Sequence, residues 1–127
     1  MTKTISKLAA LGVALGMAFS ALPALADVSG NFEGRSNHVT GGTASIVEDG
    51  GTYYVVLGAD FSLDNGPDPR VALGNDGYDA STQLGALISL NGEQRYAIPA
   101  SIDVSNYDQV WIWCEAASVP LGVAELN

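Results

Sequence analysis

The feature that most constrains this fold is a tight-turn signal between two β-rich segments. Glu48-Asp49-Gly50-Gly51 separates Thr43–Val47 from Thr52–Leu57. An Asp-Gly pair favours a hairpin because both residues tolerate the positive φ angles that the tightest turns require. We therefore predict two antiparallel strands that are joined directly at this point.

A second turn signal, Asn91-Gly92, lies between Leu84–Leu90 and Glu93–Ile98. Asn-Gly between β-rich segments is among the strongest short-range hairpin signals, and we predict a second hairpin here. Pro99 has no N–H group to donate to a β-ladder, so we expect it to end the second of these strands.

The rest of the chain beyond residue 26 shows no sustained 3.6-residue hydrophobic pattern of the kind that predicts a helix. Further strands are predicted at Gly30–Gly34, Val71–Leu73, Gln109–Cys114 and Ser118–Leu126. About seven to eight short antiparallel strands at this spacing predict an all-β fold, either a small β-sandwich or a partly closed barrel. No linker or internal repeat divides residues 27–127, which we treat as one domain.

Residues 1–26 have the three parts of a secretory signal peptide. Lys3 and Lys7 precede an apolar run from Leu8 to Leu22, and Ala24-Leu25-Ala26 has the small-x-small pattern of a cleavage site. The apolar run is short for a membrane span, which needs roughly 20 residues. We predict a signal-peptide helix, cleavage before Asp27, and a periplasmic or secreted protein that keeps no membrane span.

The charge of the chain is strongly negative. All 14 acidic residues lie beyond residue 26, where the basic residues are Arg35, Arg70 and Arg95. Removal of Lys3 and Lys7 with the signal peptide would change the formal net charge from −9 to −11. Such a surface repels nucleic acid and anionic lipid and favours solubility or a basic partner. We expect the partner to be another exported or membrane protein, and not a nucleic acid.

Cys114 is the single cysteine, so the chain cannot form an internal disulfide. Two-residue alternation places it on one face of its strand with Val110 and Ile112. Three interpretations stay open: an inert thiol in the core, a redox centre or metal ligand, and an intermolecular disulfide.

His38 is the single histidine and lies in a polar, Gly-rich segment. It either braces a loop or acts as an axial haem ligand or metal ligand, since imidazole is the commonest metal ligand in proteins. The chain has no C-x-x-C-H motif, which excludes covalently attached c-type haem. One Cys and one His are too few for a structural zinc site, and the identity of any cofactor stays open.

Acidic and aromatic residues add two weaker candidates. Asp64, Asp68, Asp76 and Asp79 carry the oxygen ligands that calcium prefers, but their spacing does not match an EF-hand loop and they are also ordinary turn residues. Trp111 and Trp113 alternate with the apolar positions of their strand. They form either a binding surface for a sugar or an aromatic partner, or part of the core.

Known catalytic motifs are absent from the sequence. There is no Ser/His/Asp signature, no G-x-S-x-G motif and no phosphate-binding glycine loop. A carboxylate pair for glycoside chemistry stays open among the acidic residues, but no feature singles one out. We therefore favour a protein that is not an enzyme.

Short motifs follow one another along nearly the whole region beyond the signal peptide. They are Gly30-x-Phe32, His38-x-x-Gly41, Asp60-Phe61, Gly66-Pro67-Asp68, Val71-x-Leu73, Leu84-Gly85, Asn91-Gly92-x-Gln94-x-Tyr96-x-Ile98-Pro99, Val110-x-Ile112-Trp113-Cys114 and Gly122-x-Ala124-x-Leu126. In this order and spacing they resemble the DM-thirteen domain, which occurs beside DOMON domains in animal cell-surface proteins and alone in bacterial exported proteins.

The resemblance implies a β-sandwich-like fold and a role in redox chemistry or electron transfer. By position, the characteristic cysteine of the family is Cys114, and its histidine position falls on His38. The sequence departs from the family pattern at Ala117 and Leu121, where aromatic residues are expected. The resemblance therefore predicts a redox accessory domain centred on Cys114. The alternative is a protein- or glycan-binding module in which Cys114 is a core residue.

Overall fold

A computed structural model describes residues 28–127, and the predicted signal peptide lies outside the described residues. The described chain is all-β, apart from two short 3-10 helices. The strands are β1 (Val28–Gly34), β2 (Thr40–Gly41), β3 (Thr43–Asp49), β4 (Thr52–Leu57), β5 (Ser62–Leu63), β6 (Pro69–Gly74), β7 (Gly85–Ala86), β8 (Gln94–Ile98), β9 (Gln109–Cys114) and β10 (Val119–Glu125), and the helices are η1 (Ala80–Thr82) and η2 (Val104–Asn106).

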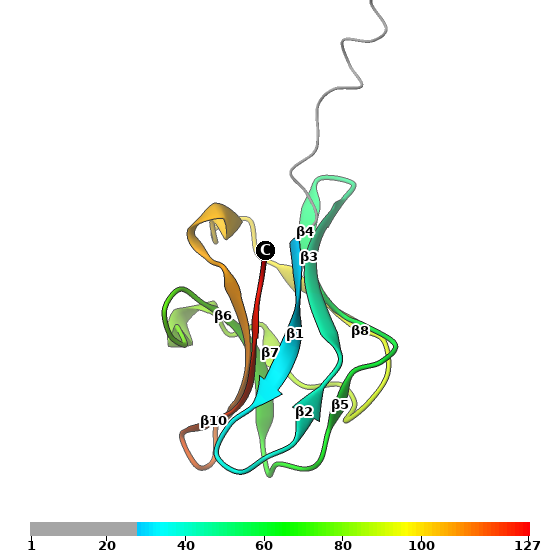
Figure 1. Cartoon of the computed structure of the whole chain (residues 1–127). Coiled ribbons are helices and arrows are strands. Elements are labelled where there is room, and N and C mark those ends of the chain that lie inside the picture. The colour runs from blue at the N-terminus through cyan, green and yellow to red at the C-terminus, as the bar shows by residue number, and fades with distance from the viewer. Residues whose placement is uncertain (1–27) are drawn as a thin grey trace, which may run out of the picture.

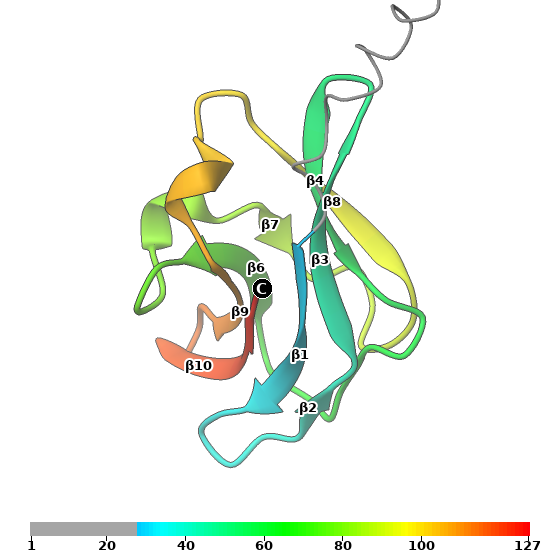
Figure 2. The same ribbon diagram turned by 45° about the horizontal axis from the view of Figure 1, so that its top comes forward.

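Eight of the strands form one antiparallel sheet in the order β7-β6-β9-β10-β1-β3-β4-β8, and β2 pairs with β5 separately. The large sheet curls into a nearly closed barrel (Figures 1 and 2). The tip of the β3–β4 hairpin marks its upper end in Figure 1, and the β9–β10 turn marks its lower end. The predicted all-β fold is confirmed, in its partly closed barrel form.

Strand β1 joins the two halves of this barrel because it changes partner along its length. Its first part pairs with β3, from Val28 opposite Ile46 to Asn31 opposite Thr43. Its last part pairs with β10, from Phe32 opposite Ala124 onward. The two half-sheets therefore meet along this strand.

The first predicted hairpin is confirmed. Asp49 pairs with Thr52 across the β3–β4 turn, and Gly50 and Gly51 have φ angles of 63° and 90°. Two successive positive φ angles define the type I′ turn, whose twist matches that of the flanking strands.

The second predicted hairpin is wrong. The strand predicted at Leu84–Leu90 is reduced to β7, which pairs with β6 instead of β8. Leu90 accepts a hydrogen bond from the Leu63 N–H at 2.8 Å, and Asn91 forms a bridge with Ser62. These contacts with β5, distant in sequence, use the backbone groups that a local hairpin would need.

The segment between β7 and β8 spans the seam between the two edges of the sheet. The Leu87 N–H donates to the Pro69 carbonyl oxygen on β6 at 2.8 Å. The next N–H group, of Ile88, donates to the Tyr96 hydroxyl on β8 at 2.8 Å. Gln94 adds side-chain hydrogen bonds to Ser89 in both directions, each of 3.1 Å. Hydrogen bonds from side chains thus close the barrel between β7 and β8, which do not pair with each other.

The core fills the inside of the barrel. Its largest fully buried side chains include Phe61, Leu57, Leu73, Ile112 and Leu121. Phe32 and Phe61 contact each other edge to face, with ring centroids 5.4 Å apart, a favoured arrangement for aromatic pairs.

Glycine is required where β1 passes closest to the end of β10. A Cβ atom at Gly30 would overlap the backbone carbonyl of Glu125, whereas one at Gly41 would make an ordinary 3.6 Å contact with the Ser62 Oγ. Gly30→Ala should lower the free energy of unfolding by about 3 kcal/mol, because backbone atoms cannot rotate away. Gly41→Ala is the matched control and should change it little. Chemical denaturation measures both, and equal effects would contradict this interpretation.

Candidate functional site

Cys114 is the last residue of β9 and lies at the lower end of the barrel. Its cross-strand partners are Pro69 on β6 and Val119 on β10. The thiol is free, faces the core with Val110 and Ile112, and is 1% exposed. A partner molecule therefore cannot touch the sulfur while the fold is closed.

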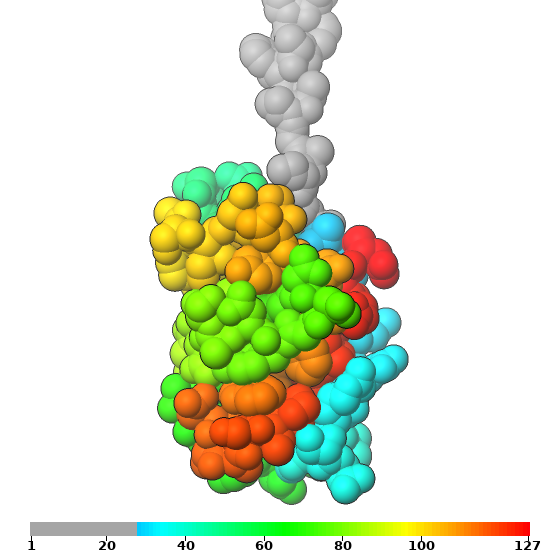
Figure 3. Space-filling model, turned by 90° about the vertical axis from the view of Figure 1, so that its left-hand side faces the viewer, coloured from blue at the N-terminus to red at the C-terminus, as the bar shows by residue number. Residues whose placement is uncertain are grey.

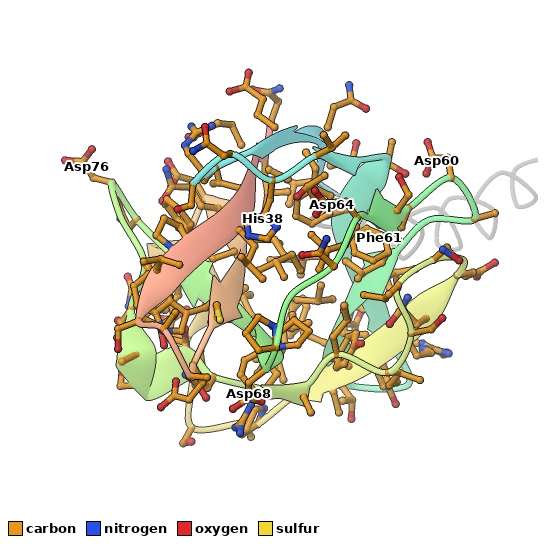
Figure 4. The ribbon with its side chains drawn as sticks, turned by 90° about the horizontal axis from the view of Figure 1, so that it is seen from below. His38, Asp60, Phe61, Asp64, Asp68 and Asp76 are labelled. Atoms are coloured by element: carbon orange, nitrogen blue, oxygen red, sulfur yellow. The ribbon has the colours of Figure 1, made fainter. Side chains whose placement is uncertain are left out.

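The Gly66-Pro67-Asp68 segment crosses the barrel end at which Cys114 lies. Figure 4 shows this loop from below, running from Asp64 to Asp68. The Asp68 carbonyl oxygen accepts the Glu115 N–H at 2.9 Å, which ties the loop to the residue after the thiol. A Cβ atom at Gly66 would lie 2.8 Å from the Leu121 Cδ1, so the loop packs closely on the core. The motif thus covers the end of the barrel that holds the thiol.

Arg70 holds the same end of this loop through the side chain of Asp68. Its Nε and Nη2 atoms donate to the two carboxylate oxygens of Asp68 at 2.9 and 3.2 Å. This bidentate geometry gives orientation as well as attraction. Both side chains are about one-third exposed, so the pair positions the loop more than it stabilises the fold.

His38 and Asp64 form a second contact at the lower end (Figure 4). The His38 Nδ1 lies 2.9 Å from the Asp64 Oδ1. The same carboxylate accepts the Val39 N–H at 3.0 Å and the Asn65 N–H at 2.7 Å. The Val39 N–H and then the His38 ring hold the pKa of the Asp64 carboxyl below its usual value. The contact braces the loop before β2 against the loop after β5.

The structure brings His38 to Asp64 and does not assemble the other predicted ligands. Within residues 28–127, no three His, Cys, Asp or Glu side chains gather into a group that could hold a metal ion. Asp79 instead accepts hydrogen bonds from Ser81, and Asp76 lies in a loop away from Asp64 and Asp68 (Figure 4). In this part of the chain the four aspartates do not converge as a calcium site.

Trp111 and Trp113 lie on the outer face of β9 and are partly exposed. Trp113 stacks on Tyr78, with ring centroids 3.9 Å apart and an angle of 6° between the rings. Trp111 donates from its Nε1 to the Gln109 Oε1 at 3.0 Å. Figure 3 views this side of the molecule, where the segment that carries Tyr78 lies against β9. Sequence reasoning missed Tyr78, because no local pattern links it to a strand so far along the chain.

Tyr96, which belongs to the family motif, has a structural position. Its hydroxyl donates to the Gln94 Oε1 at 2.6 Å and accepts the Ile88 N–H, and its side chain is buried. Burial raises the pKa of this hydroxyl. The residue therefore holds the seam of the barrel together.

The lowered pKa of Asp64 predicts a pH-dependent stability. A carboxyl with a pKa lower in the folded state stabilises the fold above its unfolded value, near pH 4, and loses this contribution as the pH falls through the folded-state pKa. Asp64→Asn should therefore lower the thermal midpoint at about pH 6, and by less at about pH 2.

Thermal unfolding of wild type and variant across this range measures the difference. Asp76→Asn, at an exposed loop position, is the matched control and should change the midpoint little at either pH. A difference between wild type and Asp64→Asn that stays constant with pH would contradict the assigned role of Asp64.

Comparison with known proteins gives one match. A family model described as electron transfer DM13 matches residues 31–126, which include the barrel and both of its ends. No curated protein and no solved structure matches the chain. Among residues 28–127, no helix has the length and apolar character that crossing a membrane requires.

Proposed function

Because this chain belongs to the electron transfer DM13 family, we propose that it is an exported redox accessory domain whose redox group is the Cys114 thiol. The family supports the general redox role. The observation that carries the assignment to Cys114 is the position of the only cysteine. It lies inside the matched region and at the barrel end that the Gly66-Pro67-Asp68 loop covers.

A buried thiol is compatible with a redox role if the Gly66-Pro67-Asp68 loop moves away from the barrel end. A thiol must meet its reaction partner directly, and the sulfur of Cys114 is covered while the barrel end is closed. Displacement of the Gly66–Asp68 segment would admit water and a partner to the sulfur without unfolding β9. Since the chain has a single cysteine, a disulfide at this position joins it to a sulfur of another molecule.

A second candidate function is a binding module in which Cys114 serves only the core. The 1% exposure of Cys114 favours it, as does the partly exposed Trp113–Tyr78 stack on the outer face. The two candidates differ in one respect that can be measured, namely whether redox behaviour depends on the thiol.

Cys114→Ala separates them, with Val110→Ala as a matched cavity on the same strand face. Each should cost about 1–2 kcal/mol of stability. In voltammetry of protein purified from cells that express the full sequence, wild type and Val110→Ala should show a redox wave, and Cys114→Ala should show none. Absence of a wave from the wild type, or a wave that persists in Cys114→Ala, would leave the binding module as the better account.

Export is tested on the signal peptide itself. Cells that express the full sequence should release a chain whose mass corresponds to a start at Asp27. Ala26→Trp should block this cleavage, because the position before the cut requires a small residue. Leu25→Trp, one residue earlier, is the control and should be processed normally. Retention of residues 1–26 in the wild type would contradict the proposal.

A further inference from the structure

A cavity of about 650 Å³ opens at the upper end of the barrel, opposite the end that holds Cys114. Its walls come from the start of β4, the end of β8 and the segment around η2. The lining residues are Gly51, Thr52, Tyr53, Ala97, Ile98, Pro99, Ala100, Ile102, Asp103, Val104 and Ser105. The volume lies within the range of about 300–1,000 Å³ that small-molecule sites occupy, and barrel mouths are a preferred position for them.

The cavity follows from how the chain leaves β8. Pro99 ends this strand, and the Ile102 N–H donates back to the Pro99 carbonyl oxygen at 3.0 Å. The chain then arches through η2 to β9 and does not add another strand beside β8 (Figure 2). The β3–β4 hairpin extends past the barrel on the other side (Figure 1). The mouth therefore lies between the paired strands β4 and β8 on one side and the segment around η2 on the other.

The inner part of the cavity is apolar and continuous with the core. Ile98 is a core residue, and Tyr53, Ile102 and Val104 pack against the core while remaining partly exposed. An apolar body that entered here would cover surface that the fold leaves in water, which is favourable in proportion to the area covered.

The rim of the cavity is polar and carries negative charge. Among the described residues that line it, Asp103 is the one charged side chain, and Thr52 and Ser105 contribute hydroxyl groups. The Asp103 Oδ1 accepts the N–H and hydroxyl of Ser105, at 3.0 and 2.6 Å, as the N-cap of η2. The chain as a whole has a formal net charge of −9, which repels anions from the mouth.

We propose that this cavity is a binding site for a small organic cation with an apolar, preferably aromatic, body. The body lies against Tyr53, Ile98 and Val104, and the cationic or hydrogen-bond-donating group lies at the rim beside Asp103. A face of the Tyr53 ring is also suited to a cation, because its π-system is electron-rich. The site is separate from Cys114 and does not depend on the redox proposal.

Fluorescence titration with two probes of opposite charge tests the site. Thioflavin T is a planar aromatic cation, and anilinonaphthalene sulfonate is an anion of similar size. Protein purified from cells that express the full sequence should bind thioflavin T at one site per chain and bind the anion at least about 5-fold more weakly. A charge interaction near a protein surface is worth about 1 kcal/mol or more, and this energy corresponds to about a 5-fold ratio between the two dissociation constants.

Three variants decide between this site and unspecific binding. Asp103→Asn keeps an equally good helix cap and should weaken thioflavin T binding about 5-fold. Ala100→Trp, at an exposed lining position, should abolish it by filling the cavity. Glu93→Gln removes one exposed charge at the opposite end of β8 and should leave it unchanged.

Each contrary result overturns the proposal. For the wild type, these results are equal affinity for both probes or no binding of thioflavin T. For the variants, they are unchanged thioflavin T binding by Ala100→Trp, or an equal loss of thioflavin T affinity in Glu93→Gln and Asp103→Asn. Cys114→Ala should bind thioflavin T as the wild type does, so failure of the redox proposal and failure of this one are distinguishable.

Discussion

The barrel depends on the exchange of partners along β1. The two half-sheets share no other strand, since β3, β4 and β8 lie on one side of it and β10, β9, β6 and β7 on the other. The exchange falls between Asn31 and Phe32, and it brings β1 against the end of β10 at Gly30. A side chain at that point would force the half-sheets apart. The absence of a Cβ atom at Gly30 thus permits this close approach of β1 to the end of β10.

This curvature gives the molecule two chemically different ends. The lower end is closed by a loop that is fixed through Asp68 and Arg70, and it holds a buried thiol beneath that cover. The upper end is left open by the arch of the chain through η2, and its lining is apolar with an acidic rim. The packed core lies between the buried thiol and the upper cavity, so the two sites that we propose would be separated by the whole length of the barrel.

Sequence reasoning succeeded where structure is determined locally. The bounds of β9 follow from alternation, and the β3–β4 hairpin follows from the Asp49-Gly50-Gly51 signal, although Asp49 ends its strand and the central turn residues are Gly50 and Gly51. Neither prediction needs knowledge of distant residues. It failed at Asn91-Gly92, because Leu90 pairs with β5. The His38–Asp64 contact, across 26 residues of sequence, could not be predicted for the same reason. The alternation of hydrophobic and polar residues does not indicate which loops contact each other in the folded barrel.

The side-chain closure between β7 and β8 also affects how copies of this protein meet one another. A sheet that ends in two bare strands offers two templates for pairing with a neighbouring chain, the usual first step toward aggregates. Here Gln94 and Tyr96 direct their hydrogen bonds to the segment that runs along the edge of β8. These side-chain hydrogen bonds hold that segment beside β8, while the exposed Arg95 keeps a charge on the same strand. The closed seam is thus less suited to pairing with a neighbouring chain than two bare edge strands would be.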